Sequence, residues 1–144
     1  MNFPLSPQQL RDRKPVWEAL ADFWLDTELV DFQFEHIARV IAASPYAIAE
    51  VKAIHDLEVV PAVSANLAGI AGEWAGFDPE WLHARCARFA ARRGSRWMRA
   101  RIWLQRPTIR YFTEDYWRQI EPRVQALRAA GDARHQPCGR GGSR

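Results

Sequence analysis

Apolar residues along this chain recur every three or four positions, which is the period of a helix and not of a strand. The clearest case is residues 31–43, where the apolar positions are Phe34, Ile37, Ala38 and Ile41. Similar spacing predicts helices over about 7–26, 45–60, 62–70, 79–93, 96–106 and 113–130. A hairpin over 101–112 ranks below a helix. The pattern therefore predicts an all-α fold of five to seven helices in a single compact bundle.

Capping residues and prolines predict where these helices begin and end. Ser6-Pro7, Ser44-Pro45 and Asp78-Pro79 each place a capping side chain before a proline suited to the first helical turn. Pro61 and Pro107 should interrupt helices, because proline lacks an amide hydrogen and restricts the residue before it. Gly131 should end the last helix. We therefore expect one helical domain over residues 1–131 and a flexible tail over 132–144.

The largest apolar side chains at helical spacing form the predicted core. These are Trp17, Leu20, Ile37, Ile41, Ile54, Leu67, Ile70, Trp74 and Trp81. Cys86 falls among apolar positions and is expected to be a buried free thiol, whereas Cys138 falls in the tail, so no structural disulfide is predicted. The four histidines and two cysteines lack zinc-site spacing, and we expect no metal and no cofactor.

Residues 72–81, GEWAGFDPEW, allow two interpretations. Glu73 and Asp78 could act as a carboxylate pair in acid–base chemistry, which requires surroundings that separate their pKa values. Alternatively, Gly72 ends one helix while Asp78 caps the next, with Phe77 before the cap packing on Leu82. The helix connection is favoured, because Asp78 stands directly before proline. Since the chain also lacks the phosphate-loop, H-E-x-x-H and G-x-S-x-G motifs, we expect a protein that is not an enzyme.

Two segments resemble a family of short proteobacterial proteins of uncharacterised function. They are residues 13–29, RKPVWEALADFWLDTEL, and residues 71–78, AGEWAGFD, and residues 37–46, IARVIAASPY, add to the resemblance. Ala21 and Trp24 depart from the family pattern, and the final third of the chain has no counterpart in it. The resemblance implies a small helical cytosolic protein and supplies no activity. By analogy, bacterial proteins of this kind are often immunity proteins, which neutralise a toxin.

Charge is divided unevenly along the chain. Residues 1–81 contain 13 acidic and 5 basic residues, whereas residues 82–144 contain 4 acidic and 15 basic residues. Either the two halves neutralise each other or each faces a charged partner. In the first half, five acidic residues form a candidate partner-binding set: Glu18, Asp22, Asp26, Glu28 and Asp31. The first three are four residues apart and share one helical face. Such a set suits the capture of a basic protein, and a solvated outer face is the alternative.

The second half contains a candidate nucleic-acid surface. Nine arginines and no acidic residue occur between Trp81 and Thr113. The residues predicted to bind nucleic acid are Arg92, Arg93, Arg96, Trp97 and Arg99, because arginine pairs with phosphates and aromatic rings stack on bases. Two observations oppose this interpretation. Arginine outnumbers lysine 18 to 2 across the chain, which indicates a general bias, and the spacing of Trp97 and Trp103 also fits a core.

These patterns favour a non-enzymatic, protein-binding protein, and most specifically an immunity protein that occludes a basic toxin domain. A helical nucleic-acid-binding regulator is the alternative, and a homodimer that buries its aromatic residues is a third hypothesis. The first residues lack the charged-then-apolar order of a signal peptide, so the cytoplasm is the expected compartment. No apolar run approaches the length of a membrane span.

Overall fold

All regular structure in the described residues 4–24, 28–67 and 77–135 of the computed structural model is helical. The elements are α1 (Pro7–Ala21), the short 3₁₀ turn η1 (Asp22–Trp24), α2 (Asp31–Ala43), α3 (Ile48–Ile54), the π-helical turn η2 (His55–Val59), α4 (Val60–Leu67), α5 (Pro79–Ala91) and α6 (Arg96–His135). The predicted all-α class is confirmed. The helix predicted over residues 31–43 has these same limits in the structure.

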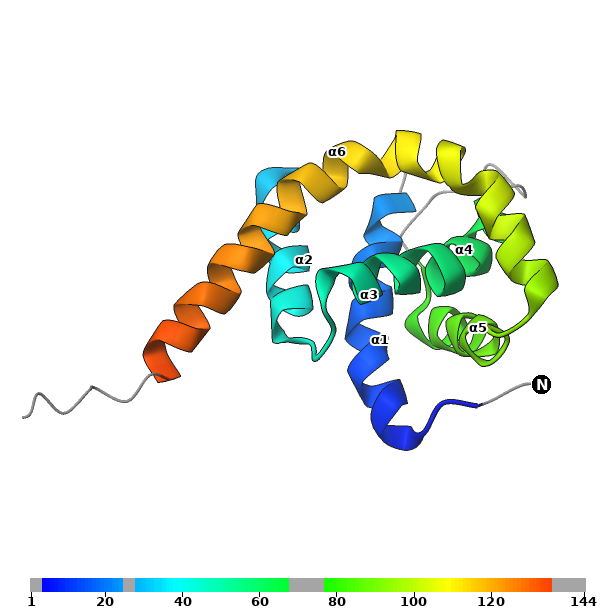
Figure 1. Cartoon of the computed structure of the whole chain (residues 1–144), viewed down its shortest axis with the longest axis horizontal. Coiled ribbons are helices and arrows are strands. Elements are labelled where there is room, and N and C mark those ends of the chain that lie inside the picture. The colour runs from blue at the N-terminus through cyan, green and yellow to red at the C-terminus, as the bar shows by residue number, and fades with distance from the viewer. Residues whose placement is uncertain (1–3, 25–27, 68–76, 136–144) are drawn as a thin grey trace, which may run out of the picture.

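Helix α6 forms an arch over the other helices (Figure 1). Its later part packs against α2, while α1, η2, α4 and α5 pack on one another under the arch. The last turns of α6 extend beyond the rest of the protein. The side of α6 that faces inward buries Met98, Ile102, Ile109, Trp117 and Ile120, and its opposite side faces away from the core.

The apolar core contains most of the residues that the sequence predicts. Trp17, Leu20, Ile37, Ile41 and Ile54 are fully buried. Trp81 is partly buried against the core, and Cys86 is a fully buried free cysteine. The Leu67 side chain, Ile70 and Trp74 lie outside the described residues, as does Cys138.

Two of the three predicted caps are confirmed. Ser6 Oγ accepts a hydrogen bond from the Gln9 amide, and the Ser6 amide donates to Gln9 Oε1, which completes a capping box on α1. Asp78 Oδ2 accepts from the Trp81 amide at the start of α5. Ser44, in contrast, closes α2: its hydroxyl donates to the Ile41 carbonyl, and α3 begins only at Ile48. A serine hydroxyl can bond to the backbone at either end of a helix. The pair Ser44-Pro45 alone therefore does not show whether Ser44 ends one helix or begins the next.

Neither Pro61 nor Pro107 interrupts a helix, which corrects two predicted boundaries. Pro61 lies within α4, directly after the π turn η2, in which the Val60 amide donates to the His55 carbonyl five residues back. This wider turn accommodates a proline that cannot donate to the carbonyl of Leu57. Pro107 and Pro122 lie inside α6, which curves along its length (Figure 1). Where surrounding packing holds a helix together, an internal proline bends the helix without ending it.

The last helix is longer than the sequence predicts at both ends. Thr113, expected near a helix start, lies inside α6 and donates its hydroxyl to the Ile109 carbonyl. Gly131 does not end the helix, because α6 continues to His135. Residues 132–135 are therefore helical, and the remainder of the predicted tail lies outside the described residues.

Arg128 joins α6 to the end of α2. Its Nη2 donates to the carbonyls of Ile41 and Tyr46 at 2.8 and 2.6 Å, with the Ser44 carbonyl at 3.4 Å. These carbonyls terminate α2 or follow it, and that of Ile41 also accepts from the amide and the hydroxyl of Ser44. A charged donor therefore satisfies the end of α2 and holds α6 across it.

Replacing Arg128 with alanine should lower the free energy of unfolding by about 2 kcal/mol, because hydrogen bonds to a charged group are lost. Urea denaturation followed by circular dichroism measures this change. Arg134→Ala is the matched control, since Arg134 donates to Ala130 of its own helix and is exposed. It should change stability by less than about 0.5 kcal/mol. Equal effects of the two variants would contradict the role of Arg128.

Candidate functional site

Of the five acidic residues predicted to bind a partner, the structure describes four, and these differ in their exposure and contacts. Glu18 lies on α1 with Oε1 2.8 Å from Nε2 of His83 on α5. Asp22 is partly buried in η1, and this burial raises the pKa of its carboxyl. Glu28 is exposed, and Asp31 is exposed at the start of α2 with Arg123 Nη2 at 3.5 Å. Asp26 lies outside the described residues.

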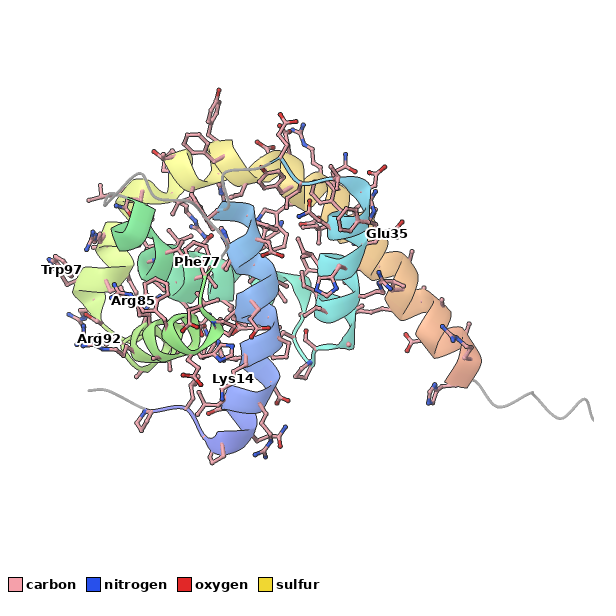
Figure 2. All side chains as sticks on the ribbon, turned by 180° about the vertical axis from the view of Figure 1, so that it is seen from behind. Lys14, Glu35, Phe77, Arg85, Arg92 and Trp97 are labelled. Carbon is pink, nitrogen blue, oxygen red and sulfur yellow. The ribbon has the colours of Figure 1, made fainter. Side chains whose placement is uncertain are left out.

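The basic residues predicted to bind nucleic acid lie together near the α5–α6 corner. Arg92 follows α5, and Arg96, Trp97 and Arg99 lie in the first turn of α6; all four are exposed. Figure 2 shows Trp97 projecting outward on the side where Arg85 and Arg92 lie. Arg93 differs, because its Nη1 lies 2.8 Å from Glu50 Oε1. Arg93 therefore pairs with an acidic residue of the first half of the chain, whereas Arg92, Arg96 and Arg99 are exposed.

The interpretation of Trp97 and Trp103 as core residues is wrong. Their side chains are 70% and 68% exposed. Leu104, Tyr111 and Phe112 are also exposed, so five large apolar side chains lie on the first half of α6. We call these five residues, with the exposed arginines Arg96, Arg99, Arg101, Arg106 and Arg110, the α6 surface. Contiguous exposed apolar patches on monomeric proteins often mark binding sites, and Trp97, Leu104 and Tyr111 lie on nearly the same side of this helix.

A groove separates the start of α6 from α4 and α5. Its volume is about 540 Å³, and Arg85, Phe89, Arg92, Trp97 and Arg101 are among its lining residues. The Arg101 guanidinium lies over the Trp97 ring at 5.7 Å from the ring centroid. Among the described residues that line this groove there is no Asp or Glu. The groove therefore combines positive charge with aromatic surface and suits an anionic group.

A buried cluster of charges lies inside the bundle, where α1, η2 and the end of α5 meet. Glu58 is fully buried; it accepts hydrogen bonds from Arg13 and from Trp17 Nε1, the latter at 3.2 Å. Arg93 Nη1 lies 3.6 Å from Glu58 and 2.8 Å from Glu50. Burial raises the pKa of the Glu58 carboxyl, while Arg13 and Arg93 oppose this rise. Two cations and two carboxylates thus compensate one another.

The π turn η2 also buries a histidine. The His55 ring is fully buried, with Trp24 Nε1 at 3.2 Å from its Nε2 and Asp56 Oδ1 at 2.9 Å from its Nδ1. The indole nitrogen can only donate, so Nε2 accepts and Nδ1 carries the hydrogen that Asp56 accepts. Both ring nitrogens are therefore used internally. In this arrangement His55 has no free lone pair with which to act as a base.

Two further features bear on chemistry. Burial raises the pKa of the Cys86 thiol, which keeps this side chain protonated and unreactive. In the described part of the chain, no group of three or more His, Cys, Asp or Glu side chains could hold a metal ion. The second member of the proposed carboxylate pair, Glu73, lies outside the described residues.

Comparison with known proteins supplies a family. A family model described as a domain of unknown function, DUF7079, matches residues 11–123. The chain belongs to the DUF7079 family. The match agrees with the resemblance to an uncharacterised family, and the DUF7079 region includes both the buried cluster and the α6 surface. No curated protein and no solved structure matches the chain. Of the helices that the structure describes, none is both long and apolar enough to cross a membrane.

Leu104, Tyr111 and Phe112 are not among the surface residues that the sequence predicts. Trp97, Leu104 and Tyr111 are seven residues apart, a spacing that was visible in the sequence. It indicates one helical face but not whether that face is buried or exposed. Only the packing of Met98, Ile102 and Ile109 against the core shows that this face points outward.

Replacing Arg13 with methionine should lower the free energy of unfolding by about 3–5 kcal/mol, because Glu58 stays buried without its main partner. Without Arg13 the folded-state pKa of Glu58 rises further above its unfolded value. The folded protein then binds more protons, so stability falls as pH rises, and the loss should be larger near about pH 8 than near about pH 5. Urea denaturation at both pH values measures this difference.

Two further variants control this experiment. Arg13→Met combined with Glu58→Leu should recover most of the lost stability, because no unpaired carboxylate remains. Lys14→Met changes an exposed neighbour and should shift stability by less than about 0.5 kcal/mol. A double variant as unstable as Arg13→Met, with no pH dependence, would show that the ion pair is unimportant.

Proposed function

We propose that this DUF7079 protein is a non-enzymatic binding protein whose protein partner docks on the α6 surface. The observation that carries the proposal is the exposure of Trp97, Trp103, Leu104, Tyr111 and Phe112 on one helix. Aromatic residues and arginine are enriched at the centres of protein interfaces. Tryptophan, tyrosine and arginine also dominate binding energy when such interfaces are probed by alanine substitution.

The electrostatics of the α6 surface favour an acidic partner. From Arg96 to Thr113 the helix carries five arginines and no acidic residue. The positive potential of these arginines would steer an acidic protein toward the surface and would repel a basic protein. The apolar side chains would then supply most of the affinity through burial.

Nucleic acid is a second candidate partner, supported by the groove between α4, α5 and α6. Its arginines could pair with phosphates while Trp97 and Phe89 offer stacking surfaces. Arg92 and Arg101 both line it. This candidate requires strong dependence on salt, because binding to phosphates releases counterions.

Trp97→Ala combined with Leu104→Ala should abolish recovery of the partner from lysate of the native cell while leaving the fold intact. Because Trp97 and Leu104 are both exposed, their replacement should leave the helical circular dichroism spectrum unchanged. The measurement is affinity capture of the tagged protein, with and without nuclease, followed by quantitative mass spectrometry. We expect one protein in stoichiometric yield that survives nuclease treatment.

Phe32→Ala is the matched control for this capture. Phe32 is 70% exposed, as Trp97 is, but lies on α2. It should retain the partner fully. If the double variant recovers the same partner as the unaltered protein, the α6 surface is not the binding site. If the captured proteins are lost on nuclease treatment, the protein binds nucleic acid and not a dedicated protein partner.

The narrower proposal is an immunity protein that occludes a basic toxin domain through its acidic residues. It uses a different surface, and the exposure of Glu28 and Asp31 supports it. Glu18 and Asp22 contribute less, because Glu18 contacts His83 and Asp22 is partly buried.

The immunity proposal predicts that Glu28→Lys with Asp31→Lys slows association with a basic toxin domain by about tenfold, through lost electrostatic steering. Surface plasmon resonance at low salt measures the rate, and growth in cells that also express the toxin measures protection. Asp132→Lys, exposed in the last turns of α6, is the control and should change the association rate much less. Equal rates for the double variant would oppose the acidic set as the steering surface.

A further inference from the structure

Three exposed side chains of the α6 surface lie on one line along the helix. Trp97, Leu104 and Tyr111 are seven residues apart and 70%, 72% and 81% exposed. Seven residues make almost two helical turns, so these side chains lie on nearly the same face. The buried residues Met98, Ile102 and Ile109 lie on a different side of the same helix, although Met98 and Ile102 border the groove that Trp97 also lines. We call this line the outer seam.

The positions beside the outer seam follow the pattern of a coiled-coil interface. If Trp97, Leu104 and Tyr111 take the a position of a heptad, then the small or short residues Ala100 and Pro107 take d. The flanking e and g positions include Arg101 on one side and Arg96 and Arg110 on the other. In paired helices, charges at e and g select the partner and its orientation. All three arginines are exposed and therefore accessible to such a partner.

We propose that the outer seam binds an amphipathic helix of the partner with apolar residues on one face and Asp or Glu beside it. This inference rests on the proposed binding function and adds the chemistry of the partner. Charge complementarity favours an acidic partner helix. Its acidic side chains would pair with Arg96, Arg101 and Arg110 while its apolar residues cover the seam. Along the seam, the large a residues alternate with the small d residues. The partner's side chains could pack into the spaces over the d residues.

A second copy of this helix fits the outer seam poorly. Two α6 helices packed along their seams would bring the exposed arginines of one copy against those of the other, and like charges across an interface cost binding energy. Single-stranded nucleic acid would use the aromatic rings but gains nothing specific from the aliphatic side chain of Leu104. The periodic apolar line is best explained by a helical partner.

The length of the outer seam sets the length of the partner helix. The 15 residues from Trp97 to Tyr111 are separated by 14 steps, which rise roughly 21 Å along the axis. A partner helix of about 15 residues or more is needed to cover it. Because α6 arches over the other helices with Ile102 and Ile109 buried beneath it, a helix on the outer seam would contact the outer side of the arch.

The test uses three labelled 21-residue peptides and the full chain. The first has leucine at two positions of each heptad, glutamate beside them and alanine elsewhere. The second has the same composition with the heptad order scrambled, and the third has lysine in place of glutamate. Fluorescence anisotropy measures binding to the unaltered protein, to Leu104→Glu and to the matched control Phe32→Glu, at physiological ionic strength.

The acidic heptad peptide should bind the unaltered protein and Phe32→Glu equally. The scrambled and lysine peptides should bind at least about tenfold more weakly, as should the acidic peptide to Leu104→Glu. Equal binding of the ordered and scrambled peptides would overturn the proposal, because charge alone would then suffice. Equal binding to the unaltered protein and Leu104→Glu would also overturn it.

Two further outcomes separate this inference from the proposed function. If no peptide binds while the captured cellular partner still depends on Trp97 and Leu104, the partner is not an acidic helix but the binding function stands. If analytical ultracentrifugation shows a dimer of the unaltered protein that Leu104→Glu dissociates, the seam is occupied by a second copy and the proposal is wrong.

Discussion

The carboxylate of Glu58 constrains this structure more than any other polar group. It is fully buried, and an unpaired carboxylate in that position would cost several kcal/mol, so its partners must be held in place. Arg13 and Trp17 approach it from α1, and Arg93 approaches it from the end of α5. One acidic side chain therefore ties together three parts of the chain that are distant in sequence. The π turn η2 supplies the backbone geometry that places Glu58 and His55 inside together.

This internal pairing also determines what the surface presents. Arg93 is drawn inward by Glu50 and Glu58 immediately before α6 begins, which fixes the corner between α5 and α6. At the other end, Arg128 attaches α6 to the carbonyls that end α2. A long helix anchored near both ends must arch over the bundle with one side buried. Its other side, with Trp97, Leu104 and Tyr111, is then left facing solvent.

Sequence patterns predicted the helices of this protein better than their boundaries or its surfaces. The limits of α2 followed from its apolar period, and the cap at Asp78 followed from the proline after it. The helix boundaries predicted at Pro61 and Pro107 were wrong. Tertiary packing can retain a proline inside a helix, and local sequence rules do not include that packing. The same applies to Trp97, whose spacing fits a core or a binding face equally well until the inward side of α6 is known. The pairing of Arg13 with Glu58, 45 residues apart, had no local signal at all.

We expect the outward face of α6 to contact a protein in the cell, and a photo-crosslinking amino acid at position 104 would detect that contact. The same amino acid at position 32, on the exposed side of α2, provides the reference. We predict that irradiation of living cells links position 104 to one protein of a different chain, and that position 32 gives no such adduct. An adduct at position 32 alone, or adducts at position 104 only with nucleic acid or with a second copy of the chain, would contradict the claim.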